Sequence, residues 1–452
     1  MLILALMGPA VSGCESTQEV ESQDLVSRGD VTLTPNANVV TYYTASWTSE
    51  LSGRTRLEID DGDVPVLVTD WQDGPNAVDV PVLGLWPSHT FSARLVDETE
   101  GLLARSEFTT AAGPTEMSLT TTNGTATWGG YLVTGIANSL LQTVVVLAPN
   151  GQPVWYWQTE GSYFSRACLR RDGLGLWLLR MPPSLDGLVP GSILSVAWDG
   201  TVLLDVSPFG HEGQGPSHDL LELEDGRLLF LAPDDRAVDG TVYTGHTLYA
   251  LETDGSETQL WSAWDDFTPD STFRSPPDWT HANALRWNED RKTLWVSLRG
   301  LNALVELDPE TWRPINEFGG PNPSFEVSAG TVPPSGQHQF DFRGGRLAVH
   351  DNRDVEQGSR VVVYDVDFES RPGQIVETWE FVPNPPFFDY IMGDVSWLDD
   401  DGLVVTWSAA GMIEERRLDG ASPWSIQLDL GALFLYTQRV DALPGTTPVS
   451  PG

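Results

Sequence analysis

The chain has 452 residues, with 25 basic side chains against 64 acidic ones and a formal net charge of −39. A charge of this sign and size repels nucleic acid and anionic lipid surfaces, so we exclude both as partners of the protein body. An anionic substrate would require a local basic pocket inside this acidic body. Only two cysteines occur, Cys14 and Cys168.

The first residues predict export and lipid attachment. Residues 1–13 (MLILALMGPAVSG) are apolar, too short to span a bilayer, and run directly into Cys14. This pattern is typical of a bacterial lipoprotein signal peptide, although it lacks a basic start, and a fortuitous cysteine is the alternative. We expect residues 14–29 to be a flexible tether and the protein to be periplasmic or at the cell surface, with membrane contact only through the lipid on Cys14.

Residues 30–112 show short alternating runs such as TRLEIDDG, VPVLVTDW and HTFSARLVDE. Strands of five to seven residues with frequent turn signals and no helical period predict a small N-terminal β-sandwich.

Residues 113–452 repeat one plan, in which a strand, a turn of Asp, Gly or Asn and a more apolar strand follow one another. Five segments show it, and each is extended by a second hairpin: RACLRRDGLGLWLLR from Arg166, SHDLLELEDGRLLFLA from Ser217, THANALRWNEDRKTLWVSLR from Thr280, QHQFDFRGGRLAVHDN from Gln337 and MGDVSWLDDDGLVVTWS from Met392. With an earlier unit around 131–158, the pattern predicts an all-β chain that ends in a six-bladed β-propeller.

Equivalent positions on the first strands of propeller blades face the central channel. Alignment of the repeats puts His218, His281 and His338 at one such position. A single strand histidine is usually structural, but three at one repeat position indicate a shared site. Asn283, two residues after His281, should share its face of the strand. Arg299 and Asn352 align on the returning strands and should lie near the same cluster, where we expect both to contact the substrate.

At these residues the sequence resembles the bacterial arylsulfotransferase family, through SHD, WTHAN with the following SLR, and GQH followed by HDN. The resemblance implies a sandwich followed by a six-bladed propeller, and transfer of a sulfuryl group from an aryl sulfate donor to a phenolic acceptor without PAPS. It also implies that His338 is transiently sulfated, that His281 and His218 assist, and that Asn283 and Arg299 hold the sulfate. Some members carry a disulfide near the site, which this chain lacks.

The residue types fit such chemistry independently of the resemblance. A neutral imidazole at His338 can attack sulfur and form a sulfohistidine, and the fork of Arg299 suits the non-bridging oxygens. A protonated His281 can donate to the leaving phenolate, with His218 sharing that work. We expect neither a cofactor nor a metal, and we expect Arg439 to enter the channel as a further substrate contact.

Three alternatives stay open at this point. The propeller could be a hydrolase or lyase, a metal enzyme that uses the three histidines as ligands, or a surface-anchored binding protein without activity. Neither the oligomeric state nor the physiological donor and acceptor follows from the sequence.

Overall fold

The protein is almost entirely β-structure, as the sequence predicted. The computed structural model describes residues 28–50, 53–62, 64–99, 101–113, 120–137, 142–159, 163–181, 191–206, 215–269, 278–428 and 431–449. Within these ranges the helices are short, namely α1 (Ala263–Asp266) and the 3₁₀ turn η2 (Arg299–Leu301). None of the described helices is long and apolar enough to cross a membrane. Residues 1–27, with the expected signal peptide and Cys14, lie outside the described residues.

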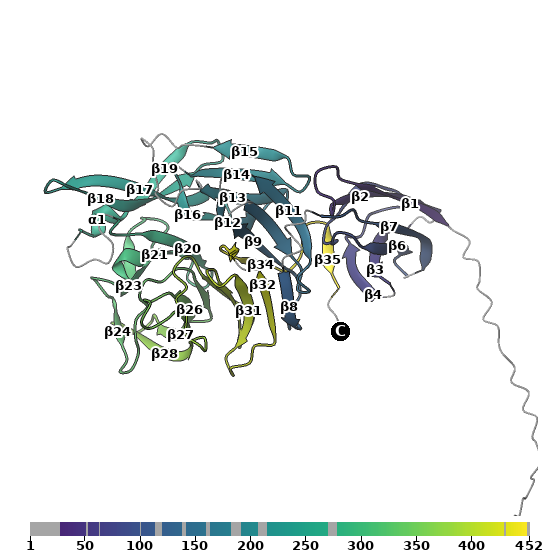
Figure 1. The fold of residues 1–452 in the computed structure, drawn as a ribbon. Coiled ribbons are helices and arrows are strands. Elements are labelled where there is room, and N and C mark those ends of the chain that lie inside the picture. The colour runs from purple at the N-terminus through teal and green to yellow at the C-terminus, as the bar shows by residue number, and fades with distance from the viewer. Residues whose placement is uncertain are drawn as a thin grey trace, which may run out of the picture.

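The N-terminal strands form two sheets around one apolar core, which contains Trp47 and Phe91. In β2, buried and partly exposed side chains alternate, as expected for a strand with one face against a core. The C-terminal strand β35 pairs with β4, so it lies at the junction between these N-terminal sheets and the rest of the molecule in Figure 1. One sheet is β1 (Gly29–Pro35), β2 (Tyr43–Ser49) and β5 (Ala77–Val82), and the other is β35 (Thr446–Pro448), β4 (Val64–Thr69), β3 (Thr55–Asp61), β6 (Thr90–Asp97) and β7 (Leu102–Thr109).

Six further sheets follow along the described chain, each built around three or four consecutive antiparallel strands. The first three are β9 (Tyr131–Ala137), β10 (Gln142–Leu147) and β11 (Pro153–Thr159), with β33 (Leu433–Phe434) and β34 (Gln438–Val440); β12 (Tyr163–Leu169), β13 (Gly175–Met181), β14 (Ser192–Ala197) and β15 (Val202–Val206); and β16 (Ser217–Glu222), β17 (Leu228–Val238), β18 (Thr241–Leu251) and β19 (Glu257–Ser262).

The fourth to sixth sheets continue the series. They are β20 (Ala282–Asn288), β21 (Thr293–Leu298), β22 (Ala303–Leu307) and β23 (Pro314–Gly319); β25 (Phe340–Arg343), β26 (Arg346–Asp351), β27 (Arg360–Asp367) and β28 (Gly373–Phe381), extended by β24 (Phe325–Val327); and β29 (Asp394–Trp397), β30 (Gly402–Trp407), β31 (Met412–Arg417) and β32 (Trp424–Leu428), extended by β8 (Thr120–Gly124). Only β24 pairs in parallel, with β28, among these sheets as described.

The first strands of successive sheets pack side by side, from β9 through β12, β16, β20 and β25 to β29. The last sheet lies next to the first, because one apolar cluster contains Leu132 and Val145 of the first sheet and Ile413 and Trp424 of the sixth. The hydroxyl of Thr437 links the same two sheets, accepting a hydrogen bond from Thr406 Oγ1 at 2.9 Å and donating one to Thr134 Oγ1 at 3.2 Å.

A buried ionic network joins the first strands at their centre. Arg166 on β12 lies 3.3 Å from Asp219 on β16 and 3.4 Å from Asp394 on β29. Asp219 Oδ2 also accepts hydrogen bonds from the backbone N–H of Leu285 at 2.9 Å and from Gln339 Nε2 at 2.6 Å. Buried charges are tolerated only when they are paired in this way, so the network fixes the relative positions of the strands that carry the histidines.

Candidate functional site

His338 precedes β25 and is almost completely buried, at 3% exposure. Its Nδ1 lies 2.7 Å from Oδ1 of Asn352, which follows β26. The side-chain amide of Asn352 donates in turn to the backbone oxygens of Asp389, at 2.6 Å, and Met392, at 2.9 Å. Because the amide nitrogen is committed to two carbonyls, Oδ1 must be the atom that faces His338.

This arrangement defines the tautomer of His338. An amide oxygen can only accept, so Nδ1 carries the hydrogen and Nε2 keeps its lone pair. Burial lowers the pKa of His338 well below its ordinary value of 6.5, the positive charge of Arg299 lowers the pKa further, and the hydrogen bond to Asn352 opposes the shift. His338 is therefore a neutral imidazole near pH 7, with Nε2 as its nucleophilic atom.

His281 directly precedes β20 and has a different partner. Its Nδ1 lies 2.6 Å from Oδ2 of Asp278, and its backbone N–H donates to Oδ1 of the same carboxylate at 3.1 Å. Burial alone would raise the pKa of Asp278, but the hydrogen bond from His281 and the charges of nearby histidines hold this pKa well below its usual range. A carboxylate only accepts hydrogen bonds, so Nδ1 of His281 carries a hydrogen and Nε2 points away from Asp278.

His218 on β16 packs edge-on against His281, with ring centroids 5.0 Å apart. Its Nδ1 is buried and has no hydrogen-bond partner among the described residues. Burial lowers the pKa of His218 well below 6.5, and the charges of His281 and His246 lower it further. His218 is therefore a second neutral imidazole.

The backbone is strained at two of these histidines. His218 has φ +63° and His281 has φ +43°, conformations that side chains other than glycine adopt at a cost on the order of 1–3 kcal/mol. The strand pairing is also irregular next to each of them, between Ser217 and Leu220 and between Ala282 and Ala284. A β-bulge re-aims the side chains beside it, and here it turns two imidazoles toward one another.

Arg299 and Asn283 lie beside this cluster. The backbone N–H of Arg299 donates to the carbonyl of His281 at 3.2 Å, which places η2 next to that histidine. Asn283 is fully buried, donates from Nδ2 to the carbonyl of Gln337 at 2.9 Å, and leaves its Oδ1 without a partner among the described residues. The strand alternation that placed His281 and Asn283 on one face does not apply, because His281 precedes the strand and Asn283 sits at the bulge.

Two predicted substrate contacts need correction. Asn352 lies behind His338 as its orienting partner, and its amide hydrogens are committed to backbone carbonyls, so it has no donor for a substrate. Arg439 does not join the cluster in the structure: its Nη2 pairs with Asp441 Oδ1 at 2.6 Å and its guanidinium lies over the Trp128 ring. The reason is that β34 pairs with the first sheet and directs Arg439 toward Asp441 rather than toward the histidines.

Sequence reasoning gave no site role to Asp278, His246 and Tyr436. His246 lies 6.4 Å from His218 between ring centroids, and its Nδ1 bonds to Thr280 Oγ1 at 2.8 Å. The fully buried Tyr436 lies 6.4 Å from His338 between ring centroids and donates to the carbonyl of Asn283 at 2.9 Å. The one feature of the sequence that could have pointed to Asp278 is its place in the DWTHAN stretch, three residues before His281.

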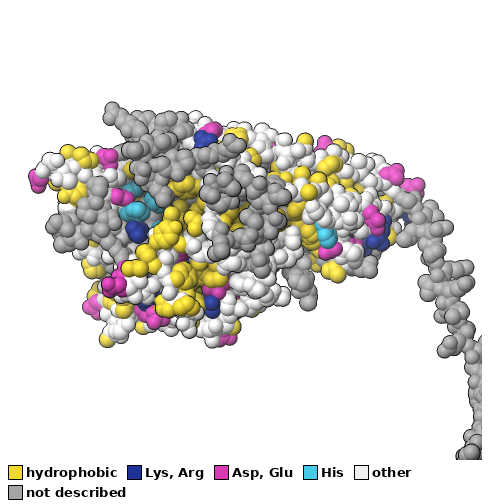
Figure 2. Space-filling view, in the orientation of Figure 1, with side chains coloured by type: hydrophobic (Ala, Val, Ile, Leu, Met, Phe, Trp, Pro, Cys, Tyr) yellow, Lys and Arg dark blue, Asp and Glu magenta, His cyan; other side chains and the backbone are white. Residues whose placement is uncertain are grey.

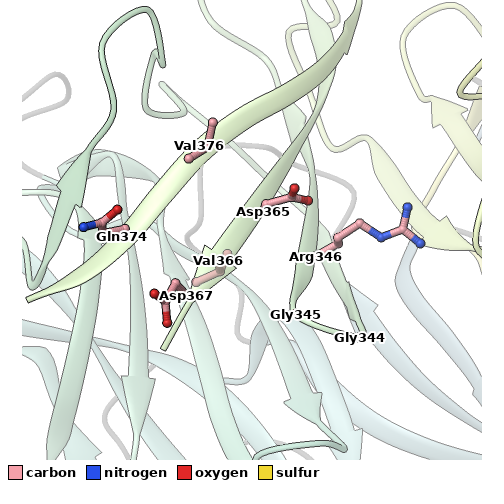
Figure 3. A pocket seen from close by; sticks show the side chains of 8 residues that line it. All are labelled: Gly344, Gly345, Arg346, Asp365, Val366, Asp367, Gln374 and Val376. Carbon is pink, nitrogen blue, oxygen red and sulfur yellow. The ribbon is translucent and has the colours of Figure 1, made fainter. Parts of the chain in front are cut away.

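The cluster is exposed only in part, because His218 and His281 are half-buried whereas His246 and His338 are buried. Figure 2 shows histidine side chains on one face of the molecule beside a basic and an acidic side chain, with hydrophobic side chains next to them. The pocket drawn in Figure 3, of about 440 Å³, lies over β26, β27 and β28 and contains none of the histidines. A second pocket, of about 490 Å³, is lined by Arg166, Cys168 and Gln438 and also contains no histidine.

Within the described residues, no group of three or more His, Cys, Asp or Glu side chains is arranged to hold a metal ion. The Nδ1 atoms of His338 and His281 are occupied by Asn352 and Asp278. Together the cluster offers a neutral nucleophile, a carboxylate-backed imidazole and a nearby guanidinium, which suit attack on an anionic group and protonation of a leaving oxygen.

Comparison with known proteins gives one informative match. The family pattern Arylsulfotransferase (ASST) matches residues 116–313, which confirms the resemblance stated from the motifs. The matched segment contains His218, His281, Asn283 and Arg299, whereas His338 lies beyond it. No curated protein sequence matches the chain.

Several solved structures are weakly similar. A streptogramin B lyase has 12% identity and a TM-score of 0.38, with 70% of this chain and 90% of that chain covered. A periplasmic gluconolactonase from Pseudomonas aeruginosa has 14% identity and a TM-score of 0.43, with coverages of 86% and 99%. A protein of unknown function from Bacteroides caccae has 13% identity and a TM-score of 0.44, with coverages of 68% and 98%. We draw no functional conclusion from likenesses of this strength.

Proposed function

We propose that this protein, whose residues 116–313 match the arylsulfotransferase family, is an aryl-sulfate sulfotransferase that works through a sulfohistidine on a six-bladed propeller. The six consecutive sheets, with the last next to the first, support six blades. The family match supports an aryl sulfate as donor and a phenol as acceptor. The observation that carries the mechanism is the hydrogen bond from His338 Nδ1–H to Asn352, which leaves a neutral Nε2 for attack.

In the first half-reaction, Nε2 of His338 attacks the sulfur of the donor as the bond between sulfur and the phenolic oxygen breaks. The electron pair of that bond leaves with the oxygen, which takes the Nε2 proton of His281 in its imidazolium form, while Nδ1–H stays bonded to Asp278. Arg299 stabilises the non-bridging oxygens, by analogy with phosphoryl transfer. In the second half-reaction, His281 removes the proton of the acceptor phenol, whose oxygen attacks sulfur and releases His338. PAPS has no role in either step.

The mechanism predicts a covalent intermediate. Mixing the purified protein with 4-nitrophenyl sulfate without acceptor, followed by an alkaline quench, should add about 80 Da to the intact mass, as expected for one sulfuryl group on a nucleophile. The adduct should be absent in His338→Ala and should disappear when phenol is added.

His89→Ala is the matched control, because His89 pairs with Asp61 in the N-terminal part of the chain at 2.8 Å, far from the cluster in sequence. This variant should form the adduct normally. Release of nitrophenol without an adduct and without any dependence on phenol would instead support a hydrolase.

We also propose that the protein is exported and held at a membrane by lipid on Cys14. The support is the apolar run of residues 1–13 followed by cysteine and a polar tether. Lipid attachment predicts that the full chain partitions into the membrane fraction and that Cys14→Ser releases it. Equal partitioning of the two proteins would exclude the anchor.

A further inference from the structure

Asp278 holds His281 at two points. One carboxylate oxygen accepts the backbone N–H of His281 at 3.1 Å, and the other lies 2.6 Å from Nδ1 of its ring. The first contact is formed with a backbone at φ +43°, a conformation that histidine rarely adopts. The carboxylate therefore stabilises both the unusual backbone and the orientation of the imidazole.

The segment that carries Asp278 is itself fixed. Asp278 bridges in parallel to Thr244, and the backbone N–H of the next residue, Trp279, donates to the carbonyl of Thr244 at 3.2 Å. The side chain of Trp279 is fully buried in the apolar core between the third and fourth sheets. On the other side, Gly300 donates to the carbonyl of Thr280 at 2.9 Å.

The four histidines of the cluster, namely His218, His246, His281 and His338, differ in the group that the Nδ1 atom of each ring faces. His338 faces an amide oxygen, His246 faces the hydroxyl of Thr280, and Nδ1 of His218 has no partner among the described residues. Of these four histidines, only His281 has a carboxylate within hydrogen-bond distance among the described residues; the nearest approach of His246 to Asp278 is 3.8 Å. A carboxylate behind an imidazole fixes its tautomer and stabilises the imidazolium, whereas an amide does only the first.

From these contacts we propose that Asp278 is a positioning residue that makes His281, rather than His218 or His246, the histidine that carries the proton between donor and acceptor phenols. This inference rests on the proposed function. When the bond between sulfur and oxygen breaks, Nε2–H of His281 gives its proton to the phenolic oxygen, while Nδ1–H stays bonded to Asp278. The neutral His281 then takes the proton of the acceptor phenol, so no proton is gained or lost over the cycle.

The test compares donors with good and poor leaving groups in Asp278→Asn. General acid catalysis contributes roughly 10²–10⁴-fold to rate, so the rate of adduct formation from phenyl sulfate, measured without acceptor, should fall about 100-fold. With 4-nitrophenyl sulfate, whose phenolate leaves without a proton, the rate of adduct formation should change little. In a His281→Ala background, Asp278→Asn should cause no further loss, because the two residues act as one unit.

The matched control is Asp61→Asn, which removes the carboxylate of another close Asp–His pair, Asp61 with His89 at 2.8 Å. It should leave the rate of adduct formation unchanged for both donors. Equal losses for both donors in Asp278→Asn, or losses that add to those of His281→Ala, would show that Asp278 only supports the fold and would overturn the proposal.

A second readout does not depend on activity. The Nδ1 proton of His281 should give a strongly downfield proton resonance that disappears in both Asp278→Asn and His281→Ala and persists in Asp61→Asn. If the wild-type protein transfers no sulfuryl group to any phenol, the proposed function fails, yet this resonance still shows whether Asp278 holds His281. Absence of the resonance from the folded wild-type protein would overturn the positioning contact itself.

Discussion

Gly393 offers a sharp test of how the site is supported. Its φ is +101°, and a Cβ added there would lie 2.2 Å from Cε1 and 2.3 Å from Nδ1 of His350. His350 is fully buried and packs at a tilt against Trp407, with ring centroids 5.0 Å apart, so the imidazole has little room to move aside. Gly420 is the matched control, because its φ of +95° is similar but no atom lies within 4 Å of an added Cβ.

The expected losses of stability follow from these environments. A side chain at such a positive φ costs on the order of 1–2 kcal/mol, and this cost applies to both Gly393→Ala and Gly420→Ala. Overpacking of a tight core costs typically about 1–3 kcal/mol more, and this cost applies only next to His350. The free energy of unfolding should therefore fall by about 2–5 kcal/mol in Gly393→Ala and by about 1–2 kcal/mol in Gly420→Ala. Denaturant unfolding followed by tryptophan fluorescence measures both.

Activity should separate the two variants as well. The carbonyl of His350 accepts the backbone N–H of His338 at 3.1 Å, and β26, which carries His350, leads directly into Asn352. A displaced His350 therefore disturbs the orientation of His338, and Gly393→Ala should form the sulfuryl adduct more slowly while Gly420→Ala does not. Equal stability losses in the two variants, or a normal rate in Gly393→Ala, would refute this account of the packing behind His338.

Two further predictions concern the buried histidines. Because the pKa of His338 lies below 6.5 in the folded protein, the rate of adduct formation from 4-nitrophenyl sulfate should stay constant as pH falls through 6.5; a halved rate at pH 6.5 would contradict this. Burial lowers the pKa of His246 to about 4, so the unfolded state binds the proton first, and this histidine should remove about 2–3 kcal/mol of stability as pH falls from 7 to 4.5. The free energy of unfolding of His246→Gln, measured at the same two pH values, should lack that loss. If the variant and the wild type lose the same stability, His246 is not the source of the loss.

Much of the fold was predictable because it follows from local patterns. The hairpin of β20 and β21 was expected from the polar turn at Asn288–Asp290, and it forms as predicted, with Ala282 opposite Leu298. The repeat spacing likewise led to sheets of consecutive antiparallel strands. Such features depend on periodicity and turn residues, which a single sequence contains.

The support of the site was not predictable in the same way, since it depends on contacts between distant segments. Asp219 follows His218 directly, and its sequence neighbourhood gives no sign that it pairs with a buried Arg166 about fifty positions earlier. Asn352 was expected to touch substrate because it aligns with Arg299. Its actual role depends on the carbonyls of Asp389 and Met392, which come from a different segment of the chain.

The partners of the histidines explain how chemically identical side chains can take different roles in one cluster. The amide behind His338 fixes a hydrogen on Nδ1 without adding charge, and burial then keeps the ring neutral, which suits a nucleophile. The carboxylate behind His281 adds a negative charge that an imidazolium can balance, which suits a proton carrier. Removing the two partners should therefore cause two different defects. Loss of Asn352 should slow formation of the adduct with every donor, whereas loss of the Asp278 charge should slow it only where the leaving phenol needs a proton.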